Sequence, residues 1–180
     1  MISLVSTSQD VRSTETKIAD LIARFPVTDI RLIEKLMNEM NLLGEPGLAE
    51  ICNQIIPAGT GDDSRYRFAV DSYSRFLSQK GNETERTVWE KICIKHAIAK
   101  KDNGVEDFFM KQLQIIGGDA SAEAMKPFLS SKEMCQPALA VILAVGGKTS
   151  ETILAESLKN KDLPCAAAVM NALALMHSQS

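Results

Sequence analysis

The sequence predicts an all-α protein, an α-α superhelix of about ten antiparallel helices. Apolar residues recur at helical spacing along the chain, and most glycines and prolines lie where the predicted helices end. The C-terminal half also repeats itself. Residues 135–147 have similar stretches 29 residues before and after them, so that the pair Gly117-Gly118 aligns with the pair Gly146-Gly147. A fixed period of this length is typical of stacked helical repeats.

This pattern predicts a single domain over residues 1–180, made of three parts. Residues 1–61 form N-terminal helices, residues 62–104 a long central helix pair, and residues 105–180 the regular repeats. One helical pair cannot cover its own apolar face, so we expect stacked neighbours to share a core. The last helix stays apolar at the end of the stack, which predicts either truncation from a larger protein or self-association through this helix.

Each helix has start and stop signals of its own. Pro26 and Pro57 end helices, Asp29 can cap the second helix, and Gly44 closes that helix. Asn103-Gly104 fits a left-handed C-terminal cap for the longest helix. The predicted helices occupy residues 10–24, 30–43, 48–56, 64–78, 84–101, 105–116, 120–130, 134–146, 149–159 and 163–176.

Composition and charge exclude several classes of protein. A hydrophobic fraction of 45% is ordinary for a folded chain and excludes gross disorder. The net charge of −3 argues against a general nucleic-acid binder; the 9 basic and 6 acidic side chains of residues 62–101 are explained by solvated helix faces. No run approaches the ~20 apolar residues of a membrane-spanning helix. The start MISLVSTSQ lacks the basic residues and long apolar run of an intact secretory signal.

The four cysteines are widely spaced, and each lies within an apolar helical pattern. No CxxC pair or zinc-site spacing occurs, and a chain of this length does not need disulfides as its framework. We therefore expect four small, buried side chains, which leave the redox compartment undecided. They are Cys52, Cys93, Cys135 and Cys165.

The polar loop at residues 58–64 is the strongest candidate for a ligand site. Its candidate ligands are Thr60, Asp62, Asp63 and Arg65. Exposed amides at the start of the next helix favour an anion, but the adjacent aspartates would repel it. The loop also has too few spaced oxygen atoms for a dedicated calcium site. Capping of the following helix is therefore the preferred interpretation.

Two other motifs have simpler structural explanations. Gly147-Lys148-Thr149 matches the end of a phosphate-binding loop, but Ile142 stands where that loop requires glycine, and a helix rather than a strand is predicted before it. Cys93 and His96 lie on one helix face, yet two ligands do not make a metal site, and a largely buried histidine is expected. The sequence predicts no catalytic residues, cofactor or metal.

The alternating helical pairs resemble HEAT or armadillo repeats. Residues 51–77, 108–147 and 151–158 are similar to helical-repeat regions of secreted bacterial proteins that often carry a domain of the 3-keto-disaccharide hydrolase family. The similarity rests chiefly on PAGTGDD followed by RYRFA, and on QLQIIGG. It implies an exported bacterial envelope protein, periplasmic or secreted, that is linked to carbohydrate use. No catalytic residue carries over.

The sequence therefore favours a non-enzymatic scaffold that binds a protein partner or positions an attached domain, without nucleic acid as a partner. A helical-repeat enzyme or nucleic-acid-binding protein of the HEAT-like glycosylase type is the alternative, and it would need a basic concave face. Direct carbohydrate binding is the third hypothesis. It would need exposed aromatic side chains from Tyr66, Tyr73 and Trp89, although the last two are expected in the core.

Overall fold

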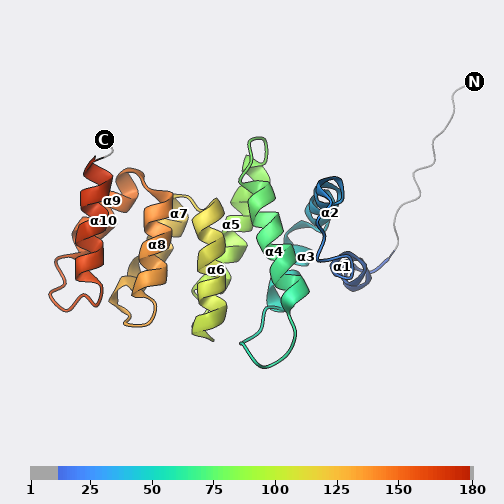
Figure 1. The fold of residues 1–180 in the computed structure, drawn as a ribbon, viewed down its shortest axis with the longest axis horizontal. Coiled ribbons are helices and arrows are strands. Elements are labelled where there is room, and N and C mark those ends of the chain that lie inside the picture. The colour runs from blue at the N-terminus through green and yellow to red at the C-terminus, as the bar shows by residue number, and fades with distance from the viewer. Residues whose placement is uncertain (1–11, 179–180) are drawn as a thin grey trace, which may run out of the picture.

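The computed structural model describes residues 12–178, and this part of the chain is all-α, without strands. Ten α-helices and one short 3-10 helix are joined by brief links (Figure 1), which confirms the predicted helical class. The helices are α1 (Thr14–Ile22), α2 (Ile30–Leu42), α3 (Gly44–Asn53), α4 (Ser64–Leu77), α5 (Glu83–Ala97), α6 (Asn103–Ile116), α7 (Asp119–Met125), η1 (Lys126–Ser130), α8 (Cys135–Val145), α9 (Gly147–Ser157) and α10 (Ala166–Ser178).

The helices form two layers, the odd-numbered helices in one and the even-numbered helices in the other (Figure 1). Within the first layer α3 packs on α5, α5 on α7 and α7 on α9. Within the second, α4 packs on α6, α6 on α8 and α8 on α10. The first and last helices therefore lie at opposite ends of the molecule. Of the helices in residues 12–178, none has both the length and the apolar character needed to cross a bilayer.

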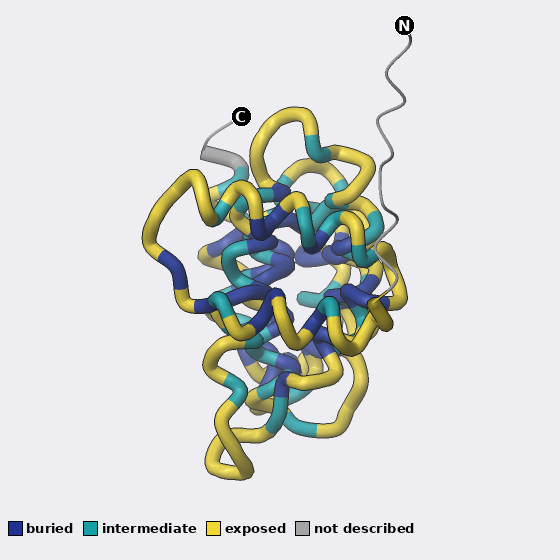
Figure 2. The backbone as a smooth tube through the Cα atoms, turned by 90° about the vertical axis from the view of Figure 1, so that its right-hand side faces the viewer, coloured by how far each residue is buried: buried dark blue, intermediate teal, exposed yellow. Residues whose placement is uncertain are grey.

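The core lies between the two layers. Viewed along the molecule, buried segments line the middle and exposed loops surround them (Figure 2). Its largest buried side chains include Trp89 of α5 and Tyr73 of α4, whose rings pack edge to face with centroids 4.9 Å apart. The Trp89 indole N–H donates to Ser74 Oγ at 2.9 Å, and Ser74 Oγ donates to the Val70 carbonyl at 3.1 Å. The buried polar groups of this cluster are thus paired, as interiors require.

Gly44 closes the second helix as predicted, because it follows the C-cap Leu43 of α2 with a left-handed φ of +64°. Two other predicted boundaries are wrong. Helix α3 already begins at Gly44 and not at Leu48. Asn103-Gly104 begins α6 and does not end α5. Asp102 caps α6, because its Oδ1 accepts the Val105 amide at 2.9 Å. An asparagine–glycine pair that follows an aspartate can therefore begin a helix when the aspartate acts as the cap.

Pro127 divides the helix that is predicted over residues 120–130. The α-helical part, α7, ends at Met125, and the chain continues as the 3-10 helix η1. Proline has no amide proton, and its ring clashes with the carbonyl four residues earlier, so an α-helix cannot pass through it undisturbed. The tighter 3-10 turn carries the chain on towards α8.

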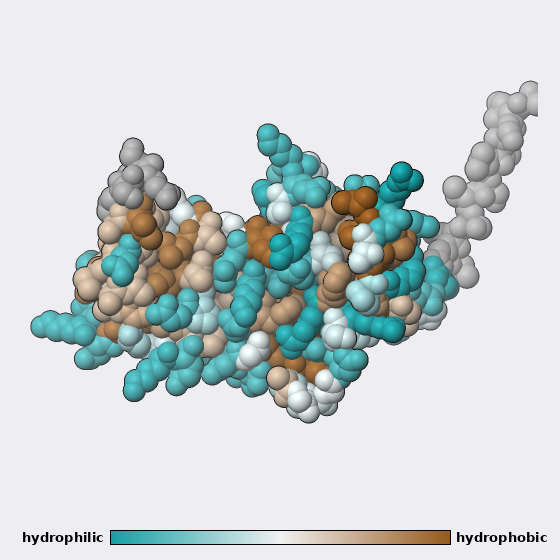
Figure 3. Space-filling model, viewed as in Figure 1, coloured by the Kyte–Doolittle hydropathy of each residue, from teal (hydrophilic) through white to brown (hydrophobic). Residues whose placement is uncertain are grey.

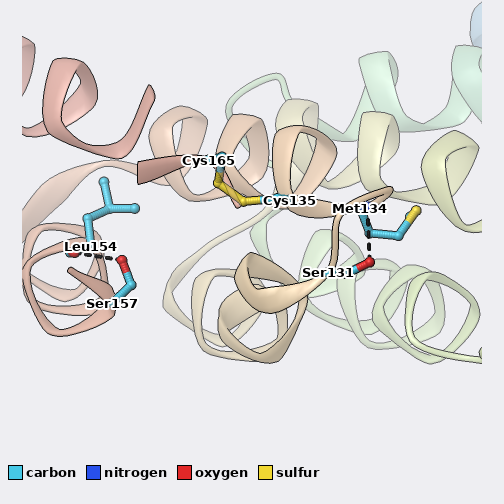
Figure 4. The surroundings of a disulfide bond; sticks show 6 residues. All are labelled: Ser131, Met134, Cys135, Leu154, Ser157 and Cys165. Carbon is cyan, nitrogen blue, oxygen red and sulfur yellow. Dashed lines mark hydrogen bonds between the residues drawn. A yellow bond between two sulfur atoms is a disulfide. The ribbon is translucent and has the colours of Figure 1, made fainter. Parts of the chain in front are cut away.

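Cys135 and Cys165 form a disulfide, which corrects the expectation of four unbonded cysteines (Figure 4). Cys135 is the first residue of α8 and Cys165 directly precedes α10; their Cα atoms lie 6.2 Å apart, a usual separation for a disulfide. The bond spans 30 residues and encloses α9. Cys52 and Cys93 are free and buried as predicted, and burial raises the pKa of both thiols.

The N-terminus of α7 is capped by a side chain from another helix. Gly118, the residue before α7, has no side chain to serve as a cap. Instead Glu90 Oε1, from α5, accepts from the Gly118 amide at 2.7 Å, the Ser121 amide at 3.2 Å and Ser121 Oγ at 2.6 Å. Gly117 must be glycine, because a Cβ there would lie 2.4 Å from the Leu113 carbonyl oxygen. A carboxylate at a helix N-terminus also interacts favourably with the helix dipole.

We expect Glu90→Ala to lower the free energy of unfolding by about 2 kcal/mol, because three donors would lose a charged acceptor. Urea denaturation followed by circular dichroism measures the change. Glu123→Ala is the control: Glu123 is an exposed residue of α7, and its substitution should alter stability by less than about 0.5 kcal/mol. Equal stability of the two variants would show that the cap contributes nothing.

Candidate functional site

The four residues of the predicted loop site lie between α3 and the first turn of α4: Thr60, Asp62, Asp63 and Arg65. Three of them, Thr60, Asp62 and Asp63, make hydrogen bonds within the link between α3 and α4. Thr60 Oγ1 donates to the Pro57 carbonyl at 2.7 Å, and Asp62 Oδ1 accepts the Ser64 amide at 3.0 Å. Arg65 is exposed. Asp62 thus satisfies an amide at the start of α4, in the manner expected of a helix-capping loop.

Asp63 forms an ion pair with Arg67, a residue outside the predicted set. Arg67 Nε lies 2.9 Å from both carboxylate oxygens. The Ile56 amide donates to Asp63 Oδ2 at 2.9 Å, and Arg67 donates to the Ile56 carbonyl at 2.8 Å. Burial alone would raise the pKa of Asp63, but these hydrogen bonds hold it below its ordinary value. The ion pair therefore contributes its full stabilisation of the loop at pH values above the ordinary aspartate pKa. This contribution is lost as the pH falls towards the lowered pKa of Asp63 in the folded protein.

Arg67 also connects this loop to α6. Its guanidinium carbon lies 4.7 Å from the centroid of the Phe108 ring, which is the geometry of a cation–π contact. Phe108 in turn packs edge to face on Phe109, with ring centroids 5.3 Å apart. Asp63 and Arg67 thus fix both the loop and one wall of the space between α4 and α6.

That space is a groove of about 650 Å³ within the even-numbered layer, which we call the α4–α6 groove. Apolar atoms are visible among polar side chains over α4 and α6 (Figure 3). The surrounding side chains mix aromatic, aliphatic, amide and charged groups. The residues that line the groove are Ser64, Arg67, Phe68, Asp71 and Arg75 from α4, and Phe108, Lys111, Gln112, Gln114 and Ile115 from α6.

Phe68 is predicted to lie in the core, but its side chain is 40% exposed. The buried stripe of α4 includes the neighbouring Ala69 and also Tyr73, and Phe68 lies at the edge of this stripe. One side of its ring packs near Phe25, with centroids 6.1 Å apart. On α6, Phe108 and Ile115 are half-buried. The groove therefore offers accessible aromatic and aliphatic surface between two helices.

Gln112 supplies an unpaired acceptor beside this surface. The side chain is only 2% exposed, and its Nε2 donates to the Phe108 carbonyl at 3.2 Å. Its Oε1 has no hydrogen-bond partner among the residues that the structure describes. Buried acceptors are paired in the great majority of cases. An N–H group that enters the groove would stabilise this oxygen.

The metal and phosphate motifs lack the surroundings that their chemistry requires. Within residues 12–178, no group of three or more His, Cys, Asp or Glu side chains is arranged to hold a metal. His96 is half-buried and stacks on Phe109 with ring centroids 4.6 Å apart; burial is the main cause of its lowered pKa, followed by Lys95 and Lys101. Gly146 and Gly147 turn the chain from helix α8 into α9 with φ of 68° and 70°, where a phosphate-binding loop would follow a strand.

The aromatic residues considered for sugar binding are mostly inaccessible. Trp89 and Tyr73 are 0% and 1% exposed, and Tyr66 is half-buried.

At the C-terminal end, Met170 and Leu175 of α10 are 54% and 59% exposed. Self-association through this helix stays a prediction that these exposed side chains support.

Comparisons with known proteins give no relative from which a function could be transferred. No family model matches the chain, and no curated protein or solved structure is significantly similar to it. The resemblance to HEAT-like repeats and to proteins with a 3-keto-disaccharide hydrolase domain therefore stays a prediction from the sequence.

Proposed function

We propose that this protein is a non-enzymatic scaffold for protein interactions, built as an α-α superhelix. The order of packing supports this proposal, because each helix from α3 onward contacts the helix two places along, as in a stack of helical pairs. In such a stack, side chains from successive helices of one layer form a continuous surface. The even-numbered layer would be that surface here.

The α4–α6 groove is the observation that carries the proposal. Phe68, Phe108 and Ile115 offer apolar contact area, and Arg67 is held in place beside them by Asp63. Aromatic side chains and arginine are enriched at the centres of protein interfaces and among the residues that dominate binding energy. The groove is open at the surface, as the 40% exposure of Phe68 indicates.

The disulfide supports a location outside the reducing cytosol. Structural disulfides persist in the periplasm and in secreted proteins and are rare in the cytosol. The pairing of Cys135 with Cys165 is therefore in keeping with the exported, carbohydrate-related envelope protein that the sequence resemblance implies. In that setting the scaffold would serve as an accessory module that holds a partner protein or an attached domain.

Selection of binding peptides from a random display library tests the scaffold proposal. We expect the oxidised full chain to enrich peptides whose binding falls at least tenfold in Phe68→Asp, since a desolvated aromatic anchor is worth about 2 kcal/mol. Ile98→Asp is a matched control, because Ile98 is also 40% exposed and does not line the groove. Failure to enrich any peptide, or equal loss in both variants, would contradict the proposal.

A further inference from the structure

Around the α4–α6 groove, the basic side chains are more exposed to solvent than the aspartates that pair with them. Each of three cations there is paired with an aspartate four residues before it in the sequence. In every pair the cation is the more exposed partner: 67% against 40% for Arg75 and Asp71, 64% against 32% for Lys111 and Asp107, and 30% against 13% for Arg67 and Asp63. The groove therefore presents positive groups to solvent and keeps their carboxylates closer to the protein.

Two of these cations stand on opposite sides of the groove. Arg75 Nε lies 2.8 Å from Asp71 Oδ2 on α4, and Lys111 Nζ lies 2.8 Å from Asp107 Oδ2 on α6. Exposed pairs of this kind are individually weak, so each cation can turn to a new carboxylate at little cost. The same groove is lined by the apolar side chains of Phe68, Phe108 and Ile115.

The groove also has the length and polarity of a peptide site. Its α4 side runs from Ser64 to Arg75, about 16 Å at the rise of an α-helix, which matches about five residues of extended chain. An extended segment carries backbone N–H groups at regular intervals, and the buried Gln112 Oε1 lacks such a donor.

We propose that the α4–α6 groove binds an acidic linear segment of a partner protein, with an apolar side chain between Phe68 and Phe108 and carboxylates on Arg75 and Lys111. This inference rests on the proposed scaffold function and specifies the chemistry of its partner. A protein segment fits better than nucleic acid, because aromatic and aliphatic side chains line the groove and the chain has a net charge of −3.

Two labelled synthetic peptides with the same phenylalanine–leucine core test the inference, one flanked by glutamates and the other by lysines. Fluorescence polarisation with the oxidised full chain gives their affinities at low and raised salt. We expect the glutamate peptide to bind roughly tenfold more tightly, with a preference that shrinks as salt rises. The double variant Arg75→Glu/Lys111→Glu should invert the preference, and Arg75→Gln/Lys111→Gln should abolish it. Circular dichroism checks that each variant is folded.

The possible outcomes separate this inference from the scaffold proposal. If both peptides bind equally and both depend on Phe68, the groove is an interaction site but does not select acidic segments, and the inference is wrong. If neither peptide loses affinity in Phe68→Asp relative to Ile98→Asp, the scaffold site fails as well. If an oligonucleotide displaces the glutamate peptide and binds more tightly than it, the basic groups serve nucleic acid, and the inference is again overturned.

Discussion

Reduction of the Cys135–Cys165 disulfide is expected to lower the free energy of unfolding of the C-terminal helices by about 3 to 4 kcal/mol. The bond spans 30 residues, and a cross-link of that length restricts the unfolded chain. Denaturation of the same protein with and without a reductant measures the difference. The double variant Cys135→Ala/Cys165→Ala is the control, because a reductant should leave its stability unchanged.

The effect should be local. In a stack of helices each element depends chiefly on its neighbours, so hydrogen exchange should speed up in α8, α9 and α10 and stay unchanged in α1 to α3. Thiol labelling of the unfolded, unreduced protein should detect two cysteines, Cys52 and Cys93. Detection of four reactive thiols in protein made under oxidising conditions would contradict the pairing.

Trp89→Ala is expected to destabilise the protein by about 3 to 5 kcal/mol, the usual range for removing a large buried side chain. The substitution leaves a cavity against Tyr73 and removes the hydrogen bond to Ser74 Oγ, at the centre of the packing between α4 and α5. Guanidinium denaturation followed by circular dichroism measures the loss.

Two further variants serve as comparisons for the Trp89→Ala result. Ser74→Ala keeps the indole but leaves its N–H buried without an acceptor, so we expect a loss of about 1 to 3 kcal/mol. Lys91→Ala, at an exposed position of the same helix, should change stability by less than about 0.5 kcal/mol. A Trp89→Ala variant as stable as Lys91→Ala would show that the cluster between α4 and α5 is not a core.

The sequence predicts the helices well where local signals suffice. The helix over residues 64–78 corresponds to α4, and Asp29 caps α2 by accepting the Arg31 amide at 2.9 Å. Apolar spacing places Trp89 and Tyr73 in the core correctly. These features depend on neighbours within about one or two helical turns, which a single sequence displays.

Features that depend on contacts between segments distant in the sequence could not be predicted from local sequence patterns. Cys135 and Cys165 meet because α8 and α10 lie in the same layer. The sequence spacing of the two cysteines does not by itself predict a disulfide. Glu90 of α5 caps α7, a helix that begins 29 residues later and packs beside α5 in the same layer. The exposure of Phe68 depends on how α4 is turned against Phe25 and α6. For the groove, the only local signal is the helical spacing of Phe108, Gln112 and Ile115.

We propose the α4–α6 groove as the surface through which this scaffold binds its partner. Backbone amide NMR spectra of the full, oxidised chain, recorded during titration with the glutamate-flanked peptide, test it most directly. We predict that the largest shift changes fall on α4 and α6, around Phe68, Phe108 and Gln112, and that α7 and α9 of the opposite layer stay unchanged. Changes confined to the odd-numbered layer, or no changes at saturating peptide, would contradict the claim.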